Sequence, residues 1–160
     1  INLKYPFTRL IIAGKGNDSP RLEKIVNKLD IKESVIFTGE IHEDDLCMVY
    51  NSSNIFSLVS QKGEMMGEGI PLTPIEAMAC GLPIIVGNHD GSREAIFDDM
   101  NGFVINPFDT DKHEDCIISL IENQSIYRNM SKHSIDIATR YFSFSDFLLK
   151  HSNFYKHVLD

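Results

Sequence analysis

Two glutamates, Glu68 and Glu76, stand where their residue type and spacing could do chemistry. They lie eight positions apart in the stretch EGIPLTPIEAMACG, residues 68–81. The first half of this stretch reads as a loop, and the second half opens a helix. A helix N-terminus presents backbone N–H groups that have no acceptor within the helix, so it can bind a phosphate without a cation. The stretch could therefore hold an anionic ligand beside two carboxylates.

Glu76 also has a purely structural interpretation. Thr73 is a suitable N-cap, Pro74 suits the first helical position, and Glu76 follows Thr73 by three residues. This spacing predicts a capping box, in which the Glu76 carboxylate accepts a hydrogen bond from the Thr73 amide. Because a carboxylate has two oxygens, one can make this bond while the other binds a ligand. Glu68 reads structurally as a solvated loop carboxylate.

The elements that must position these residues alternate along the chain. Short apolar runs predict strands, and apolar residues at helical spacing predict helices between them. This alternation is typical of an α/β fold with a parallel sheet and helices on both faces. Strands are expected at residues 9–13, 34–38, 54–59, 83–86 and 102–105. A helix is expected after Ser19, which would be its N-cap, with Pro20 at the first helical position. Further helices are expected at 43–52, 74–80, 93–97, 111–122, 125–140 and 145–159. In the helix at 43–52, the inward face carries Leu46, Val49 and Tyr50.

Loops at the carboxyl ends of parallel strands are the usual ligand sites of such sheets. Lys15 lies between two glycines in one of these loops and could cradle a phosphate together with Gly14, although a turn that ends a strand explains the pattern as well. Gly91 begins another loop-to-helix segment, with Asp90 or Ser92 as its cap. Its amide could contact a sugar.

Composition excludes several classes of protein. The chain has 160 residues, one domain's worth, with 15 Lys+Arg against 23 Asp+Glu and a net charge of −8. A nucleic-acid backbone would be repelled by such a chain. No apolar run approaches the ~20 residues of a membrane helix. The three cysteines are far apart and read as reduced thiols of a cytoplasmic protein, and no cluster of residues predicts a metal site.

The sequence resembles the C-terminal, donor-binding lobe of retaining glycosyltransferases of family four, also called group 1, which have the two-lobed GT-B architecture. The resemblance runs nearly end to end, through LIIAGKG, SVIFTGEI, VYNSSNIFSLVS, EGIPLTPIEAMACGLPII, GSREAI and NGFVINPFD. It implies that residues 1–160 form a Rossmann-like lobe whose terminal helix covers 145–160. Because the tail of this family crosses to the other lobe, that helix is expected to lack its packing surface here.

The resemblance also implies roles for individual residues. The family has two glutamates with seven residues between them. The first lies beside the donor sugar and contributes to catalysis, which implies this role for Glu68, with Glu64 as the alternative carboxylate. The second binds the ribose hydroxyls of the nucleotide, which implies this role for Glu76. The loop between them offers backbone amides to the sugar and diphosphate, and its residues here are Gly69, Ile70, Pro71 and Leu72. Pro71 has no amide to offer where many members have glycine.

The implied activity is transfer of a sugar, with retention, from a nucleoside-diphosphate sugar to a glycan or lipid-linked acceptor in polysaccharide biosynthesis. No metal or other cofactor is required. The first residues read as the end of the lobe's first helix. We therefore expect the first strand and helix, the diphosphate-binding Arg and Lys that they carry, and the acceptor-binding N-terminal lobe to be missing.

This chain would then keep part of the donor site but be inactive alone, and any peripheral membrane association would go through the missing lobe. The alternatives are a non-catalytic nucleotide-sugar-binding module and a GT-B-like nucleotide-sugar epimerase lobe.

Overall fold

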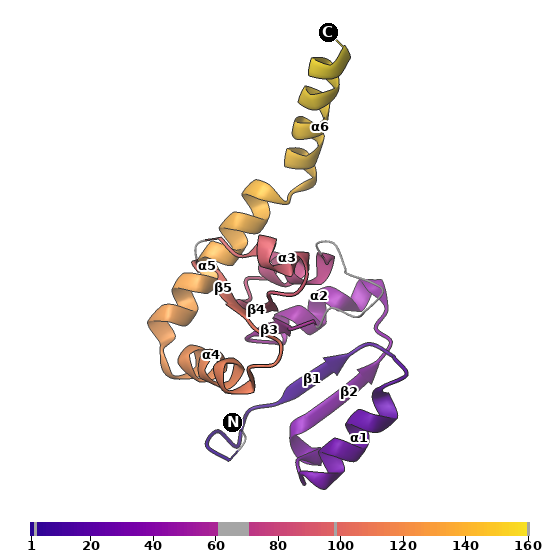
Figure 1. The fold of residues 1–160 in the computed structure, drawn as a ribbon, viewed down its shortest axis with the longest axis vertical. Helices are drawn as coiled ribbons and strands as arrows, with labels where there is room; N and C mark the ends of the chain where they lie inside the picture. The colour runs from indigo at the N-terminus through magenta and orange to yellow at the C-terminus, as the bar shows by residue number, and fades with distance from the viewer. Residues whose placement is uncertain (2, 61–70, 98, 160) are drawn as a thin grey trace. The chain divides into compact units, whose positions relative to one another are not determined.

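The structure is a computed structural model of the 160-residue chain and describes every residue except 2, 61–70, 98 and 160. The chain divides into two compact units, Ile1–Leu46 and Cys47–Asp160. Among the described residues, the first unit has a sheet of two strands and the second a sheet of three (Figure 1). The strands predicted from the sequence are all present. They form two sheets, each with parallel strands, whereas the sequence predicted one sheet.

The first unit is a strand–helix–strand arrangement. β1 (Leu10–Ala13) pairs in parallel with β2 (Val35–Gly39), as the register Leu10 to Val35 shows. α1 (Ser19–Lys28) and the 3₁₀-helix η1 (Lys32–Ser34) connect the two strands. Parallel strands require a crossover connection of this kind, because their ends lie at opposite edges of the sheet.

The start of α1 differs from the prediction by one residue. Ser19 is the first residue of the helix and not its cap, and its hydroxyl donates to the carbonyl of Gly16. Asp18 occupies the N-cap position, but its carboxylate binds the guanidinium of Arg21 at 3.0 Å and no backbone N–H. Pro20 lies in the first turn as predicted, where its missing N–H needs no acceptor.

The second unit has β4 (Ile84–Gly87) at the centre of its sheet. The order is β3-β4-β5, with β3 (Phe56–Leu58) and β5 (Gly102–Ile105) both parallel to β4. All four residues of β4 are buried, as expected for a parallel strand with both faces covered. The helices of this unit are α2 (Glu43–Asn51, which begins in the first unit), α3 (Leu72–Ala79), the 3₁₀-helix η2 (Gly91–Ala95), α4 (Thr110–Glu122), α5 (Gln124–Tyr141) and α6 (Phe144–Leu159).

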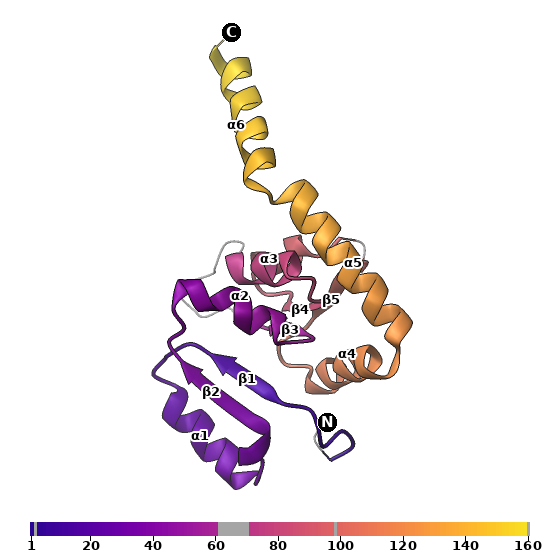
Figure 2. The same ribbon diagram turned by 180° about the vertical axis from the view of Figure 1, so that it is seen from behind.

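Side chains of β4 alternate between two hydrophobic clusters on the two faces of its sheet. Ile84 and Val86 belong to a cluster with residues of α3, η2 and α5, whereas Ile85 packs with residues of α4, α5 and β5. This alternation follows from the two-residue period of a strand. In both Figure 1 and Figure 2, α3 and α4 lie on opposite sides of the sheet. The predicted fold class, an α/β arrangement with helices on both faces, is confirmed.

The C-terminal end of α3 follows the prediction. Gly81 has a φ of +80°, a conformation that glycine adopts without a steric penalty. Its N–H donates to the carbonyl of Met78 at 2.9 Å, and the N–H of Leu82 donates to that of Ala77 at 3.0 Å. These two bonds form a Schellman motif, which ends the helix and leads the chain into β4.

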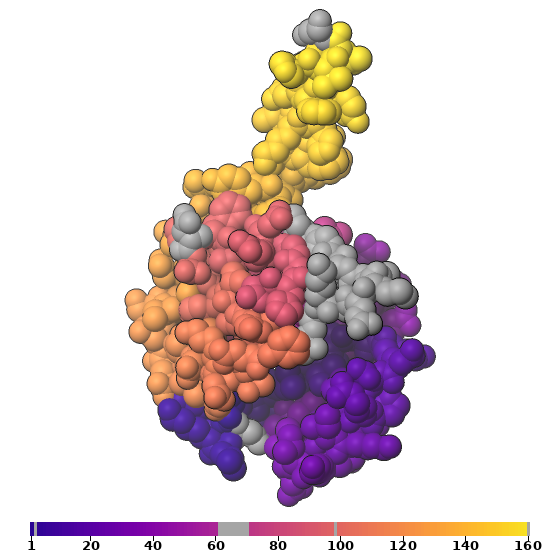
Figure 3. Space-filling view, in the orientation of Figure 1, coloured from indigo at the N-terminus to yellow at the C-terminus, as the bar shows by residue number. Residues whose placement is uncertain are grey.

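α6 contains no buried residue. Figure 3 shows this helix, in yellow, at the surface. Its exposed large apolar side chains are Phe144, Phe147, Leu148, Leu149, Phe154, Tyr155, Val158 and Leu159. Among the described residues, α6 thus has no surface that buries its apolar side chains, in line with the expectation for the terminal helix. No helix in the described part of the chain is long and apolar enough to cross a membrane.

Candidate functional site

The N-terminus of α3 is built differently from the predicted capping box. Pro71, with φ −66° and ψ 144°, is the N-cap, and no side chain caps the helix. Because the helix starts at Leu72, Thr73 is already helical, and Glu76 lies two residues beyond the third helical position that a capping box requires. The N-cap residue, Pro71, also has no N–H from which Glu76 could accept a hydrogen bond. Pro74 falls in the first turn, where its missing N–H needs no helical acceptor. The predicted box between Thr73 and Glu76 is therefore wrong.

Glu76 makes a different hydrogen bond. The hydroxyl of Tyr50, near the end of α2, donates to Oε2 of Glu76 at 2.8 Å, and both side chains are half-buried. Burial, together with this hydrogen bond, raises the pKa of Tyr50 far above its usual value. The phenol therefore remains a proton donor at physiological pH. The Tyr50 ring packs on the hydrophobic cluster beneath α3 and lies 6.0 Å from the ring of Phe56.

Two cysteines lie on the same faces of α2 and α3 as this pair. Cys47 precedes Tyr50 by three residues and Cys80 follows Glu76 by four, so each shares a helix face with its neighbour. Burial and the adjacent Cys47 thiol raise the pKa of Cys80. The amide of Asn51 donates to Sγ of Cys47 at 3.2 Å. The cysteines are free, as predicted.

Gly91 is the first residue of η2, and Asp90 caps this helix. Oδ1 of Asp90 accepts a hydrogen bond from the N–H of Ser92 at 2.9 Å, so one of the two predicted caps is confirmed. In the described part of the chain, Oδ2 of Asp90 and Oγ of Ser92 are buried without a hydrogen-bond partner. Buried polar atoms of this kind are usually satisfied. The turn at Gly91 therefore has hydrogen-bonding capacity that the described residues do not use.

Gly14 and Lys15 lie in the first unit, after β1. Gly14 has a φ of +111°, and its N–H donates to the carbonyl of Gly39 at 2.8 Å. This amide is thus already bonded within the protein, and the turn accounts for the glycine. Lys15 is exposed.

The remaining residues of the predicted site come after β3 in the sequence. Glu68, Gly69 and Ile70, and the alternative carboxylate Glu64, lie outside the described residues. Pro71 is described and has no N–H. Leu72 is exposed, and its N–H stands at the first position of α3, where the helix itself provides no acceptor.

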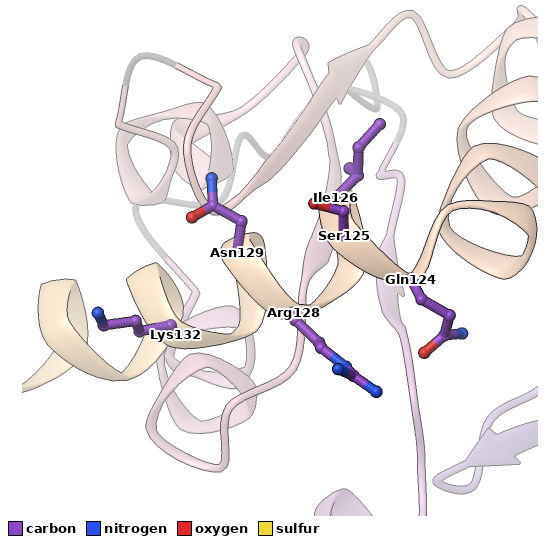
Figure 4. A pocket seen from close by; sticks show the side chains of 6 residues that line it. All are labelled: Gln124, Ser125, Ile126, Arg128, Asn129 and Lys132. Carbon is purple, nitrogen blue, oxygen red and sulfur yellow. The ribbon is translucent and has the colours of Figure 1, made fainter.

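A surface hollow on α5 is unrelated to these residues. Its volume is about 600 Å³, and it is lined by Gln124, Ser125, Ile126, Arg128, Asn129 and Lys132. In Figure 4, Gln124 and Arg128 point to one side of the helix, and Ile126 and Asn129 to the other. These side chains do not converge on one point, as those of a binding site would. Among the residues that the structure describes, no three His, Cys, Asp or Glu side chains gather as a metal site requires.

Comparison with known proteins identifies the family. The family model described as "Glycosyl transferases group 1" matches residues 2–136. The chain belongs to this family of glycosyltransferases, as its resemblance predicts, and its fold is that of GT-B enzymes.

Individual relatives agree with this assignment. The chain is 36% identical over 132 residues to an uncharacterised glycosyltransferase of Haemophilus influenzae, with 82% of this chain and 35% of that protein covered. It is 28% identical over 120 residues to the GDP-mannose-dependent monoacylated alpha-(1-6)-phosphatidylinositol monomannoside mannosyltransferase of Corynebacterium glutamicum, covering 74% of this chain and 31% of that protein.

Among solved structures, the pneumococcal O-GlcNAc transferase GtfA in complex with UDP and GlcNAc superposes with a TM-score of 0.81 at 22% identity, covering 99% of this chain and 31% of that one. The chain thus spans about a third of the length of these proteins.

The sequence did not single out Tyr50 as a functional residue, because it was assigned to the inward face of a helix. A signal was nevertheless present. A buried tyrosine hydroxyl usually has a hydrogen-bond partner. A tyrosine on an otherwise apolar helix face therefore predicts a polar group on the element that packs against that face.

Proposed function

We propose that this chain is the donor-binding part of a glycosyltransferase that transfers a sugar, with retention, from a nucleoside-diphosphate sugar to a glycan or lipid-linked acceptor. The observation that carries the proposal is the burial and hydrogen bonding of the Glu76 side chain. Its carboxylate is half-buried on α3, takes no part in capping, and has one oxygen bonded to Tyr50. The second oxygen can then accept hydrogen bonds from the ribose hydroxyls of a nucleotide.

The donors of the relatives support this class of substrate. The Corynebacterium glutamicum relative is described as GDP-mannose-dependent, and the pneumococcal structure contains UDP and GlcNAc. Both are consistent with a site for a nucleoside diphosphate carrying a sugar.

The diphosphate is held in this proposal by backbone amides. The N–H of Leu72 stands at the N-terminus of α3, where the helix dipole also favours an anion. The turn at Gly91, which belongs to the same unit as α3, offers an amide to the sugar. As the glycosidic bond breaks, positive charge develops on the sugar ring and negative charge on the diphosphate. Glu68 stabilises the first, and the amides of Gly69, Ile70 and Leu72 stabilise the second. Pro71 orients the backbone and donates nothing.

This mechanism requires no metal ion or other cofactor. It does require an acceptor, which in the proposal is bound by an N-terminal lobe that also supplies a surface for α6. The proposal rests here on the chain's coverage of only about a third of its relatives and on the exposed apolar side chains of α6. The enzyme acts in the cytoplasm, and any contact with a membrane goes through the missing lobe.

Isothermal titration calorimetry tests the donor site directly. We expect the chain to bind UDP or GDP, and Glu76→Gln to weaken that binding about tenfold, because an amide accepts a weaker hydrogen bond than a carboxylate. Glu68→Ala should leave the affinity for the nucleoside diphosphate unchanged and weaken only the added affinity for the sugar. Absence of binding to both nucleotides, or an affinity unaffected by Glu76→Gln, would contradict the proposal.

A further inference from the structure

A glutamate side chain that makes no hydrogen bond has more conformational freedom than the ribose contact proposed for Glu76 allows. A glutamate has three side-chain torsions, and the last of them is broad, so its carboxylate can face several directions. A ligand that needs one direction must first restrict this freedom, which reduces its affinity. Within the described part of the chain, the hydroxyl of Tyr50 is the one side-chain group that hydrogen bonds to this carboxylate.

Tyr50 is well suited to fix that direction. Its ring is anchored by the cluster beneath α3 and by Phe56, so its hydroxyl has little freedom of its own. The bond to Oε2 of Glu76, at 2.8 Å, has the usual length for a hydroxyl donor and joins a neutral donor to a carboxylate. A lysine or arginine in this place would neutralise the carboxylate. A phenol leaves Glu76 with its full charge and with Oε1 available.

We infer that Tyr50 is a positioning residue for nucleotide binding, which holds Oε2 of Glu76 so that Oε1 faces the ribose hydroxyls of the donor. The inference rests on the proposed function, because it takes the ribose role of Glu76 as given. Tyr50 itself touches no part of the nucleotide. Tyr50 therefore affects binding only through the preference for a nucleotide with a ribose over one with a 2′-deoxy or 3′-deoxy sugar.

A simpler role is also consistent with the same hydrogen bond. Tyr50 and Glu76 join α2 to α3, and the bond could serve only to hold these helices together. Loss of a link of this kind between the helices would lower the thermal stability. It would also weaken the binding of every nucleotide to the same extent. The two roles therefore differ in whether the effect depends on the ribose.

The test compares the ribonucleotides UDP and GDP with their 2′-deoxy and 3′-deoxy counterparts by calorimetry. The wild-type chain should bind a ribonucleotide more tightly than at least one deoxy counterpart. Tyr50→Phe keeps the ring and removes the hydroxyl. We expect it to weaken ribonucleotide binding about fivefold to tenfold and to leave binding of that deoxy counterpart unchanged.

Three further variants sharpen the comparison. Tyr141→Phe is the matched control, because Tyr141 stacks on Phe97 at 5.0 Å and lies about half exposed in another helix of the same unit. It should retain the wild-type preference. In a Glu76→Ala background, Tyr50→Phe should cause no further loss, because its effect acts through Glu76. Tyr50→4-aminophenylalanine restores a donor on the same ring and should restore the preference, even if Tyr50→Phe proves poorly folded.

The outcomes separate the inference from the proposed function. If Glu76→Ala removes the preference for ribose but Tyr50→Phe retains it, the donor site stands and the inference is wrong. If Tyr50→Phe weakens the binding of ribonucleotides and deoxynucleotides equally, the inference is also wrong. Tyr50 would then serve only to hold α2 and α3 together. If the wild-type chain shows no preference at all, the ribose role of Glu76 fails and the inference fails with it.

Discussion

His113, on α4, illustrates how burial sets the chemistry of a single residue outside the proposed site. Its Nε2 lies 2.9 Å from Oγ of Ser57 on β3, and its side chain is half-buried. Burial disfavours the charged imidazolium and lowers the pKa of His113 from its ordinary value of 6.5. The unfolded chain therefore binds a proton at His113 more readily than the folded chain does.

The pH dependence of stability follows from this difference. Between pH 6.5 and the lowered pKa of His113, the unfolded state carries more bound proton, so the free energy of unfolding falls as the pH falls. The contribution is complete above about pH 6.5 and lost below the lowered pKa. Urea denaturation across this window should show that His113→Gln flattens the dependence. His157→Gln, at an exposed position on α6, should not. Parallel curves for the wild type and His113→Gln would contradict the prediction.

Sequence patterns identified residues whose partners are close in the chain and missed those whose partners are distant. Asp90 was predicted as a cap because the N–H that it binds is two residues away. Tyr50 was missed because its partner, Glu76, is 26 residues away and reaches it only after α2 and α3 have packed. The capping box failed for a local reason. The extended backbone of Pro71 starts α3 at Leu72, before Thr73 can act as a cap.

The pairing of β4 with β5 depends on one glycine. Gly102 stands opposite Ile84 in the register of these strands, and a Cβ placed on it would lie 1.9 Å from the carbonyl oxygen of Ile84. Because that atom belongs to the backbone of the central strand, no side-chain rotation can relieve the overlap. We predict that Gly102→Ala destabilises the second unit by about 3 kcal/mol or more.

Thermal or urea denaturation measures this effect. Gly16→Ala is the matched control, because a Cβ on Gly16 would meet nothing within 4 Å and its backbone does not have a positive φ. It should change the free energy of unfolding by less than about 0.5 kcal/mol. A Gly102→Ala protein as stable as the Gly16→Ala protein would contradict the close approach of β4 and β5.

At the scale of elements, the sequence predicted which segments are strands and helices better than where they begin. Apolar runs correctly marked strands, both in β4, which is fully buried, and in β1, which has no buried residue. Helix starts are decided by single side chains and backbone angles. α3 accordingly begins at Leu72 and not at the predicted Pro74, and α1 begins at Ser19, the residue predicted as its cap. The division of the strands between two sheets is a tertiary property that the pattern of each strand does not encode.

At the scale of the whole molecule, membership of the glycosyltransferase family was predictable because its motifs extend along most of the chain. The family model covers residues 2–136, which includes both glutamates and the turn at Gly91. The net charge of −8 disfavours binding of an anion by the chain as a whole, so the proposed donor site must use local backbone amides at helix starts. A site of this kind is local, so it can form even where the chain as a whole is acidic.

The chain's extent leads to the last prediction. Sugar transfer needs the donor and the acceptor held together, because orientation of the two reactants supplies much of the rate enhancement. The donor side is assigned to this chain in the proposed function, and the acceptor side to a lobe outside it. We therefore expect this 160-residue chain to bind UDP or GDP in calorimetry and to give no sugar transfer above background from the matching nucleotide sugars.

The positive control for that assay is a combined protein in which this chain is joined to the N-terminal lobe of a full-length group 1 enzyme. The exposed apolar residues of α6, among them Phe147 and Leu148, should then become protected from hydrogen exchange in the combined protein. Transfer by the isolated chain would contradict the assignment of acceptor binding to another lobe. Absence of protection in α6 would instead contradict the N-terminal lobe as the packing surface of this helix. The two measurements thus test separately where the acceptor binds and what the terminal helix packs against.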